Sequence, residues 1–318
     1  MKLLLAGANG QVGHELRRAL APLGEVVAAT RDGTLDDGGT CERADLAQPE
    51  TLVALLDRVR PDVIVNAAAY TAVDRAEAEP ALALRVNGEA IGVFGRWAAV
   101  HGARVVHYST DYVFDGSATR PWREDDTVAP LGAYGRSKLA GENALRDSGA
   151  EHLLFRTAWV YAARGHNFLR TMLRLGAERE RLSVVDDQRG TPTPAALIAD
   201  VTAAALKHWL DGNDATRRAL KGTYNLVATG ETTWCGFARA IMQRAATAGL
   251  LARAPEVAAI SSAEFPTPAQ RPAYSVLDTT RLRETFGIAL PTWQHGLDAV
   301  IAELQAGTNR FPLFTRNI

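Results

Sequence analysis

The sequence has little cysteine. Only two of its 318 residues are cysteines, Cys41 and Cys235, and they lie far apart with no partner at metal-binding spacing. Disulfide-stabilised domains and structural zinc sites both need several cysteines at short, repeated intervals. The sequence therefore predicts neither of these, and the fold must depend on an ordinary hydrophobic core.

The sequence also lacks an excess of either charge and any long apolar run. It has 35 basic and 36 acidic residues, for a net charge of −1. This balance argues against binding to nucleic acid or to a strongly charged partner. No segment approaches the roughly 20 apolar residues that span a bilayer, and the apolar start of the chain enters a glycine-rich turn without a cleavage-site pattern. We expect a cytoplasmic protein that binds neither nucleic acid nor membrane.

What the first half does contain is a regular alternation of short apolar runs with helical patterns. Runs that are apolar throughout indicate strands buried on both faces, and their alternation with helices predicts a parallel sheet with right-handed crossovers. The expected fold class is α/β, a Rossmann-like doubly wound parallel sheet. The predicted strands are 3–6, 26–29, 63–66, 104–109 and 152–156, and the predicted helices are 12–20, 51–59, 80–100 and 134–147.

The regularity weakens after Trp159, which suggests a second part. We predict a dinucleotide-binding domain over residues 1–160 and a smaller C-terminal α/β substrate domain over 161–318, with a return to the first domain near 185–230. The elements expected here are helices at 167–179, 194–210 and 234–248 and strands at 182–185 and 222–227.

A glycine-rich segment follows the first predicted strand and opens the first helix. Glycines at this spacing allow a tight turn and close approach of the backbone to a pyrophosphate. The helix N-terminus adds free N–H groups and a partial positive charge. The strand–turn–helix context predicts a dinucleotide site, with contacts from Gly7, Gly10, Gln11, Val12 and Gly13.

The end of the second predicted strand bears on the choice of cofactor. An acidic residue there would hold the ribose 2′-hydroxyl of NAD, but this chain has Thr30 and Arg31, with Asp32 next. A guanidinium suits a 2′-phosphate, so we predict NADPH, with NADH still possible and a merely exposed Arg31 as the alternative. Further cofactor contacts are expected from Asp45, Leu46, Ala67, Ala68 and Ala69.

The most informative motif is Tyr134 followed four residues later by Lys138, with Ser109 and Thr110 at the end of an upstream strand. Residues four apart lie on one face of a helix. A neighbouring ammonium favours the phenolate and brings the tyrosine pKa toward working pH. A hydroxyl at a strand end could hold a substrate oxygen beside this pair. The motif predicts proton transfer at a carbon–oxygen centre.

These motifs together make the chain resemble the extended short-chain dehydrogenase/reductase superfamily and, within it, the dTDP-4-dehydrorhamnose reductases. The resemblance spans nearly the whole chain. The matching stretches are GANGQVG (7–13), VNAAAYTAVD (65–74), STDYVF (109–114), YGRSKLAGE (134–142), RTAWVY (156–161), DDQRGTPT (186–193) and PAQRP (268–272).

The resemblance implies a reaction and roles for single residues. NADPH would reduce the C4 keto group of dTDP-4-dehydro-L-rhamnose to give dTDP-L-rhamnose, the last step of dTDP-rhamnose synthesis, which feeds cell-surface polysaccharide. Tyr134 would be the general acid, and Lys138 would bind the nicotinamide ribose and lower the tyrosine pKa. The implied substrate contacts are Thr110, at the C4 oxygen, Asp111, Tyr112 and Trp159 at the sugar, Asn87 near the site, and Arg271 at the nucleotide diphosphate.

One position departs from the family pattern. Some members form a homodimer bridged by Mg²⁺ through clustered glutamates. Glu15 is present here, but Ala196 stands where a second glutamate is expected. Since a magnesium site normally needs several oxygen ligands, magnesium bridging is not expected, and both a monomer and a homodimer stay open.

Four other functions are possible on this fold, and the first is reduction of another nucleotide sugar at its 4-keto group. A 4,6-dehydratase is expected to carry an Asp-Glu pair after the threonine, whereas Thr110 is followed here by Asp111 and Tyr112. A 4-epimerase would keep its NAD tightly bound. A non-catalytic regulatory subunit could keep the glycine turn and lose the chemistry, but the intact Thr110, Tyr134 and Lys138 argue against it.

Overall fold

The computed structural model describes residues 1–308 and is built on a seven-stranded parallel sheet in the order β11-β6-β5-β4-β1-β2-β3. This is the strand order of a Rossmann fold with one strand added, and it confirms the predicted doubly wound fold class. The strands are β1 (Lys2–Ala6), β2 (Glu25–Thr30), β3 (Glu42–Arg43), β4 (Val63–Asn66), β5 (Arg104–Thr110), β6 (Glu151–Thr157) and β11 (Gly222–Asn225).

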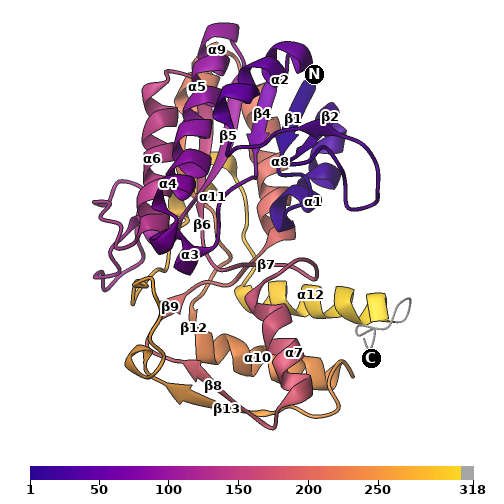
Figure 1. The fold of residues 1–318 in the computed structure, drawn as a ribbon, viewed down its shortest axis with the longest axis vertical. Helices are drawn as coiled ribbons and strands as arrows, with labels where there is room; N and C mark the ends of the chain where they lie inside the picture. Colours follow the sequence, from indigo (N-terminus) through magenta and orange to yellow (C-terminus); the bar gives the residue numbers. More distant parts are fainter. Residues whose placement is uncertain (309–318) are drawn as a thin grey trace.

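Helices cover both faces of this sheet because alternate strand residues point to opposite faces. In β1, Leu3 and Leu5 enter one core with α1 (Gln11–Leu20), α8 (Ala195–Asp211) and α11 (Thr280–Phe286). Leu4 enters the other core, whose helices are α2 (Leu52–Val59), α5 (Ala90–His101) and α6 (Ala133–Asp147). Figure 1 shows α5 and α6 on one side of the sheet and α1 and α8 on the other.

A smaller unit with its own core lies below the sheet in Figure 1. It pairs β8 (Arg181–Val185) with β13 (Glu256–Ile260) in parallel, and packs α7 (Phe168–Glu178), α10 (Trp234–Thr247) and α12 (Trp293–Thr308) around them. The sequence did not predict β13. Between these elements the chain returns to the large sheet twice, first through α8 and β11 and later through α11.

The long helix expected over 80–100 is interrupted. It consists of α4 (Pro80–Leu84), a π-helical turn η3 (Arg85–Glu89) and α5. π turns inside helices are often found at functional sites, and this one carries the buried Asn87. The remaining elements are η1 (Ala21–Leu23), η2 (Pro49–Thr51), α3 (Val73–Ala78), η4 (Asp111–Val113), β7 (Val160–Tyr161), β9 (Arg189–Gly190), β10 (Thr193–Pro194), α9 (Asp214–Leu220), β12 (Thr232–Thr233) and η5 (Ser262–Glu264).

None of the helices within residues 1–308 combines the length and the apolar character that crossing a bilayer requires.

A buried ion pair joins α6 to β6. Arg156 donates two hydrogen bonds to the Glu142 carboxylate, at 2.9 and 2.8 Å, and the side chains are 2% and 0% exposed. Arg146 binds the same carboxylate from the next turn of α6. Burial, the largest single effect, raises the pKa of Glu142, but the hydrogen bonds and charge of Arg156, a hydrogen bond from Ser109 and the charge of Arg146 together hold that pKa below its usual value. The pair therefore holds the middle of α6 against the sheet.

We predict that Glu142→Gln destabilises the protein by about 3–5 kcal/mol, because it leaves the buried Arg156 guanidinium without its counter-charge. Urea unfolding followed by circular dichroism measures this change. Glu178→Gln is the matched control, since Glu178 pairs with Arg174 at 3.3 Å where both side chains are more than half exposed, and such pairs contribute about 0–1 kcal/mol. Equal unfolding midpoints for the two variants would contradict the prediction.

Candidate active site

The predicted site residues converge because parallel strands present their carboxyl ends at one edge of a sheet. Strands β1, β4 and β5 are neighbours in the sheet. The glycine turn follows β1, the alanines at 67–69 follow β4, and Thr110 ends β5. The fold thus places the predicted cofactor turn and the predicted reaction centre along the same edge.

The turn after β1 accepts only glycine at two positions. Gly7 has φ +82°, and a Cβ there would lie 2.6 Å from the Ala68 backbone nitrogen. A Cβ on Gly13 would lie 2.0 Å from the Gly7 carbonyl oxygen. In the part of the chain that the structure describes, no side chain caps the N-terminus of α1, which begins directly after Gly10. A turn with these close approaches, followed by an uncapped helix N-terminus, suits a dinucleotide pyrophosphate.

Two of the predicted cofactor residues have side chains that contact other parts of the protein. The Gln11 side-chain oxygen accepts a hydrogen bond from Asn167 at 2.8 Å, which ties α1 to the start of α7. Val12 packs against the core that α1, α8 and α11 form on one face of the sheet. Their side chains are therefore not directed to a cofactor. Their backbone N–H groups lie in the first turn of α1, where they can donate hydrogen bonds to a phosphate.

At the end of β2, Thr30 shapes the following loop. Its hydroxyl oxygen accepts from the backbone N–H groups of Gly33 and Thr34 at 3.0 and 3.1 Å. Arg31 is exposed beside this loop. Asp32 is exposed too, and hydrogen bonds from the Thr34 backbone and the Thr30 side chain lower its pKa. Arg31 is therefore available to solvent at the edge where a 2′-phosphate was predicted to bind.

The residues after β3 have a largely structural role. The Asp45 carboxylate accepts from the Ala47 backbone N–H at 3.0 Å and from the Gln48 side chain at 3.2 Å, closing a turn. Leu46 is 4% exposed and belongs to the core. Their predicted contact with adenine stays a prediction.

The proposed acid, Tyr134, lies in the first turn of α6, and burial raises its pKa to about 12. Lys138 is fully buried one turn later, where burial lowers its pKa to about 8. Its Nζ donates to the Tyr108 carbonyl oxygen at 2.6 Å. Burial dominates the pKa of Tyr134, and Lys138 is directed to a backbone carbonyl, so the expectation that Lys138 lowers the Tyr134 pKa stays a prediction. Tyr134 is consequently a protonated phenol at neutral pH, ready to donate.

Thr110 and Asp111 form the side of the site at the end of β5. The Thr110 hydroxyl donates to Asp111 Oδ1 at 2.9 Å and accepts from the Tyr112 backbone N–H. Asp111 is 2% exposed, and burial raises its pKa to about 6. The nearby Ser275 hydroxyl lowers this pKa slightly against burial, but among the described residues no group meets hydrogen-bond geometry at Oδ2. A buried acceptor without a partner is unusual, and a substrate hydroxyl would satisfy it. The Tyr112 ring packs edge-on against Tyr134, with 5.7 Å between ring centroids.

Trp159 forms an aromatic wall with Trp234, a residue that was not among the predicted site residues. The Trp159 ring stacks on Trp234 with centroids 3.5 Å apart and an interplanar angle of 5°. Trp159 has φ +47°, a left-handed conformation that is strained for a tryptophan. Strain of this kind is concentrated at functional sites. No sequence signal distinguishes Trp234, which only opens helix α10.

The Asn87 side chain is fully engaged within the chain. Its oxygen accepts from the Tyr70 N–H at 2.8 Å, and its nitrogen donates to the Tyr70 carbonyl at 3.0 Å and to the Ser137 hydroxyl at 2.9 Å. Ser137 precedes Lys138 on α6. Asn87 therefore joins the loop after β4 to the helix that carries Tyr134, and this geometry suits a positioning role better than a direct substrate contact.

Arg271 reaches the site from a distant part of the chain. Its two terminal nitrogens bind the two oxygens of Asp74 on α3, at 3.2 and 2.8 Å, and its side chain is 21% exposed. Burial raises the pKa of the Tyr112 hydroxyl, and the charge of Arg271 partly opposes that rise. The guanidinium is thus held in place close to the predicted substrate position.

The N-terminus of α6, the helix that carries Tyr134, is capped by a side chain from another helix. Its N-cap residue, Gly132, has no side chain to offer. Instead the Glu77 carboxylate of α3 accepts from the Ala133 N–H at 2.7 Å. The sequence did not indicate Glu77, since its partner lies more than fifty residues away. Asp74 and Glu77, three residues apart on α3, thus bind two different parts of the predicted site, Arg271 and the start of α6.

Glu15 does not belong to a metal-binding cluster in the described part of the chain, since no group of three or more potential ligands is found there. Its carboxylate lies 3.8 Å from Arg18, and burial raises its pKa.

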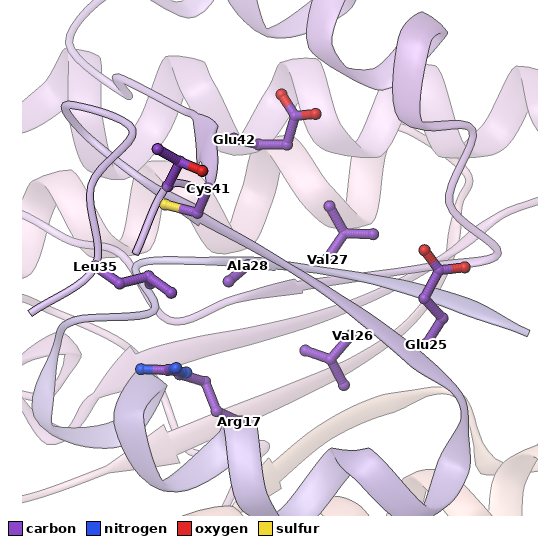
Figure 2. Close-up of a pocket in the computed structure, with 9 residues that line it drawn as sticks. Arg17, Glu25, Val26, Val27, Ala28, Leu35, Cys41 and Glu42 are labelled. Carbon is purple, nitrogen blue, oxygen red and sulfur yellow. The ribbon is translucent and has the colours of Figure 1, made fainter. Parts of the chain in front are cut away.

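A separate groove runs along β2 at the outer edge of the sheet (Figure 2). It lies beside the strand rather than at the sheet's carboxyl edge, and it is open because β3 pairs only with the last two residues of β2. It contains none of the predicted site residues, so it is not the reaction site. Its lining is Arg17, Glu25, Val26, Val27, Ala28, Leu35, Thr40, Cys41 and Glu42.

Comparison with known proteins gives consistent matches. The model of the RmlD substrate binding domain family matches residues 1–306. The dTDP-4-dehydrorhamnose reductase of Burkholderia thailandensis is 48% identical over 306 residues, which cover 96% of this chain and 99% of the relative. That of Escherichia coli K12 is 46% identical over 304 residues, covering 96% and 98%.

A solved structure agrees with these matches. The dTDP-4-dehydrorhamnose reductase of Bacillus anthracis, determined in complex with NADP, superimposes with a TM-score of 0.83 at 33% identity, covering 95% of this chain and 99% of the other. Together with the family match over almost the full length, this shows that the chain belongs to the RmlD substrate binding domain family.

Proposed function

We propose that this protein reduces the C4 keto group of dTDP-4-dehydro-L-rhamnose with NADPH, giving dTDP-L-rhamnose. The observation that carries the proposal is the placement of Thr110, Tyr134 and Lys138 at the carboxyl edge of a dinucleotide-binding sheet. The names of the relatives, and the NADP in the structure of one of them, support the substrate and the cofactor.

In the proposed reaction the side chains move one proton. Bound at the glycine turn, NADPH supplies the hydride that C4 receives. Tyr134 gives its phenolic proton to the C4 oxygen, and Thr110 orients that oxygen through its hydroxyl. Because burial keeps Tyr134 protonated, the site is set for reduction. Lys138 lies one helical turn away and favours the phenolate that forms.

In the proposed complex, different residues bind the sugar and the diphosphate of the substrate. Asp111 Oδ2, buried and without a partner among the described residues, would accept a hydrogen bond from a sugar hydroxyl. Trp159, stacked on Trp234, would offer the sugar a flat apolar face. Arg271, held by Asp74, would pair with the diphosphate, since guanidinium groups bind phosphate oxygens in a bidentate manner.

We expect Tyr134→Phe to lower kcat by roughly 10²–10⁴-fold, the usual contribution of general acid catalysis, while the Kd for NADPH stays close to that of the wild type. NADPH oxidation in the presence of the keto sugar measures the rate. Tyr108→Phe is the control, because the Tyr108 hydroxyl binds Thr202 inside the core. Full activity of Tyr134→Phe would refute the mechanism.

Arg31→Ala tests the predicted cofactor preference. We expect the KM for NADPH to rise by about tenfold or more, the value of one charge-assisted hydrogen bond, and the KM for NADH to stay unchanged. Arg31→Lys keeps the charge and should show a smaller increase. If both cofactors are affected equally, Arg31 does not contact the 2′-phosphate.

Glu77→Ala tests whether the cap on α6 positions Tyr134. Loss of a helix cap costs about 1 kcal/mol, and we expect a similar loss of transition-state stabilisation, about fivefold in kcat. Glu77→Gln retains an acceptor oxygen and should keep most of the activity. Steady-state kinetics and thermal unfolding of both variants would show the difference, and equal kcat values for the two would rule out this role.

A further inference from the structure

The two-residue strand β9 adjoins both residues that would hold the sugar. On one side, the indole of Trp159 lies against Gly190. On the other, the backbone carbonyl of Arg189 accepts hydrogen bonds from the Ser275 N–H at 2.8 Å and the Ser275 hydroxyl at 3.2 Å. Burial raises the pKa of Asp111, and the Ser275 hydroxyl nearby opposes that rise. The proposed reaction gives β9 no role, although β9 lies between the Trp159 and Asp111 sides of the site.

Position 190 has no room for a side chain. A Cβ on Gly190 would lie 2.4, 2.5 and 2.7 Å from Cε2, Nε1 and Cζ2 of Trp159, whereas non-bonded carbons prefer a separation of roughly 3.5–4 Å. These three atoms are adjacent in the indole, so their similar distances place the Cβ over the face of the ring. Gly190 is not among the glycines with positive φ. Only the contact with Trp159 therefore calls for a glycine here.

The backbone of Gly190 is held in place on both edges of β9. On one edge β9 pairs with β12 in antiparallel orientation, with Gly190 opposite Thr232. On the other edge, the Arg189 N–H donates to the Ala273 carbonyl at 2.8 Å, and the Arg189 carbonyl accepts from Ser275. Figure 1 shows β9 and β12 between the large sheet and the smaller unit. Moving β9 would break contacts on both edges, so a side chain at position 190 would have to displace Trp159.

The Trp159 indole has a neighbour on its other face as well. Trp234 stacks on it with centroids 3.5 Å apart, and Trp234 packs in turn against Phe168 at 4.6 Å. The three atoms closest to the added Cβ all belong to Trp159, so Trp234 covers the face turned away from Gly190. The left-handed backbone of Trp159 persists only where its surroundings hold it. Trp159 is still only partly buried, which leaves part of the indole accessible to a sugar.

We infer that Gly190 is a specificity-determining positioning residue of the sugar site, because its missing side chain fixes where the Trp159 indole lies. This rests on the proposed function, in which that indole contacts the sugar of the substrate. A side chain at position 190 would push the indole off Trp234, and the sugar would lose its aromatic contact. The glycine turn at the cofactor edge belongs to other elements, so NADPH binding should not change.

The position of the indole can be measured without substrate. Two indoles stacked this closely couple their electronic transitions, so the protein should show an exciton couplet in its circular dichroism spectrum. Trp234→Phe should abolish the couplet, whereas Trp97→Phe should keep it, since Trp97 stacks on a histidine, His101. We expect Gly190→Ala to lose the couplet. Gly307→Ala is the control, because a Cβ there meets nothing within 4 Å. A couplet that survives in Gly190→Ala overturns the inference, as does a wild type without one.

Steady-state kinetics test the consequence for the substrate. We expect Gly190→Ala to lower kcat/KM for the keto sugar by about tenfold, the equivalent of one good contact. The loss should appear mainly as a higher KM, because the wall binds the sugar in both the ground state and the transition state. The Kd for NADPH should stay at the wild-type value, and Gly307→Ala should change neither. An unchanged kcat/KM in Gly190→Ala contradicts the inference.

A double variant separates positioning from a general loss of packing. Gly190→Ala combined with Trp159→Ala has no indole to collide with, so its kcat/KM and its midpoint of urea unfolding should equal those of Trp159→Ala alone. If Gly190→Ala by itself does not fold, the double variant should fold again. A further loss of activity or stability in the double variant overturns the inference. A wild type that fails to reduce the keto sugar contradicts the proposed function instead, while the couplet and the unfolding of the double variant still test the placement of the indole.

Discussion

The orientation of α6 is the constraint on which the rest of the site depends, because this helix carries both the proposed acid and its lysine. It is held at three levels: Glu77 caps its first turn, Asn87 binds it through Ser137, and the buried pair of Glu142 with Arg156 joins its middle to β6. All three partners come from other elements. Tyr134 can therefore be placed accurately although the N-cap residue of its helix, Gly132, offers no side chain.

Burial is the main chemical influence at this site. It raises the pKa of the Tyr134 phenol to about 12 and lowers that of the Lys138 ammonium to about 8, because both charged forms lose hydration. The two shifts act in the same chemical sense. They keep the tyrosine protonated before the reaction and make the lysine readier to release a proton. Pairs of groups whose surroundings shift their pKa values in opposite directions are typical of acid–base sites.

The site is assembled from both parts of the chain. Gln11 binds Asn167, Trp159 stacks on Trp234, and Arg271 returns to Asp74. Each contact joins a residue of the first 160 positions to one that follows it by many positions. The sheet alone would supply the glycine turn and the Tyr134–Lys138 pair, and the later residues add the aromatic wall and the guanidinium that the proposed nucleotide-sugar substrate needs.

The sequence by itself determined the features that depend on local spacing: the buried strands, the glycine turn at Gly7 and Gly13, and a tyrosine and lysine one helical turn apart. Only the tertiary structure decided which partners these features meet. The hydrogen bonds of the π turn around Asn87 and the cap from Glu77 depend on segments distant in the chain. Periodicity reports which face of an element is apolar, whereas hydrogen-bond partners and burial, and with them the pKa values, arise only when separate elements pack together.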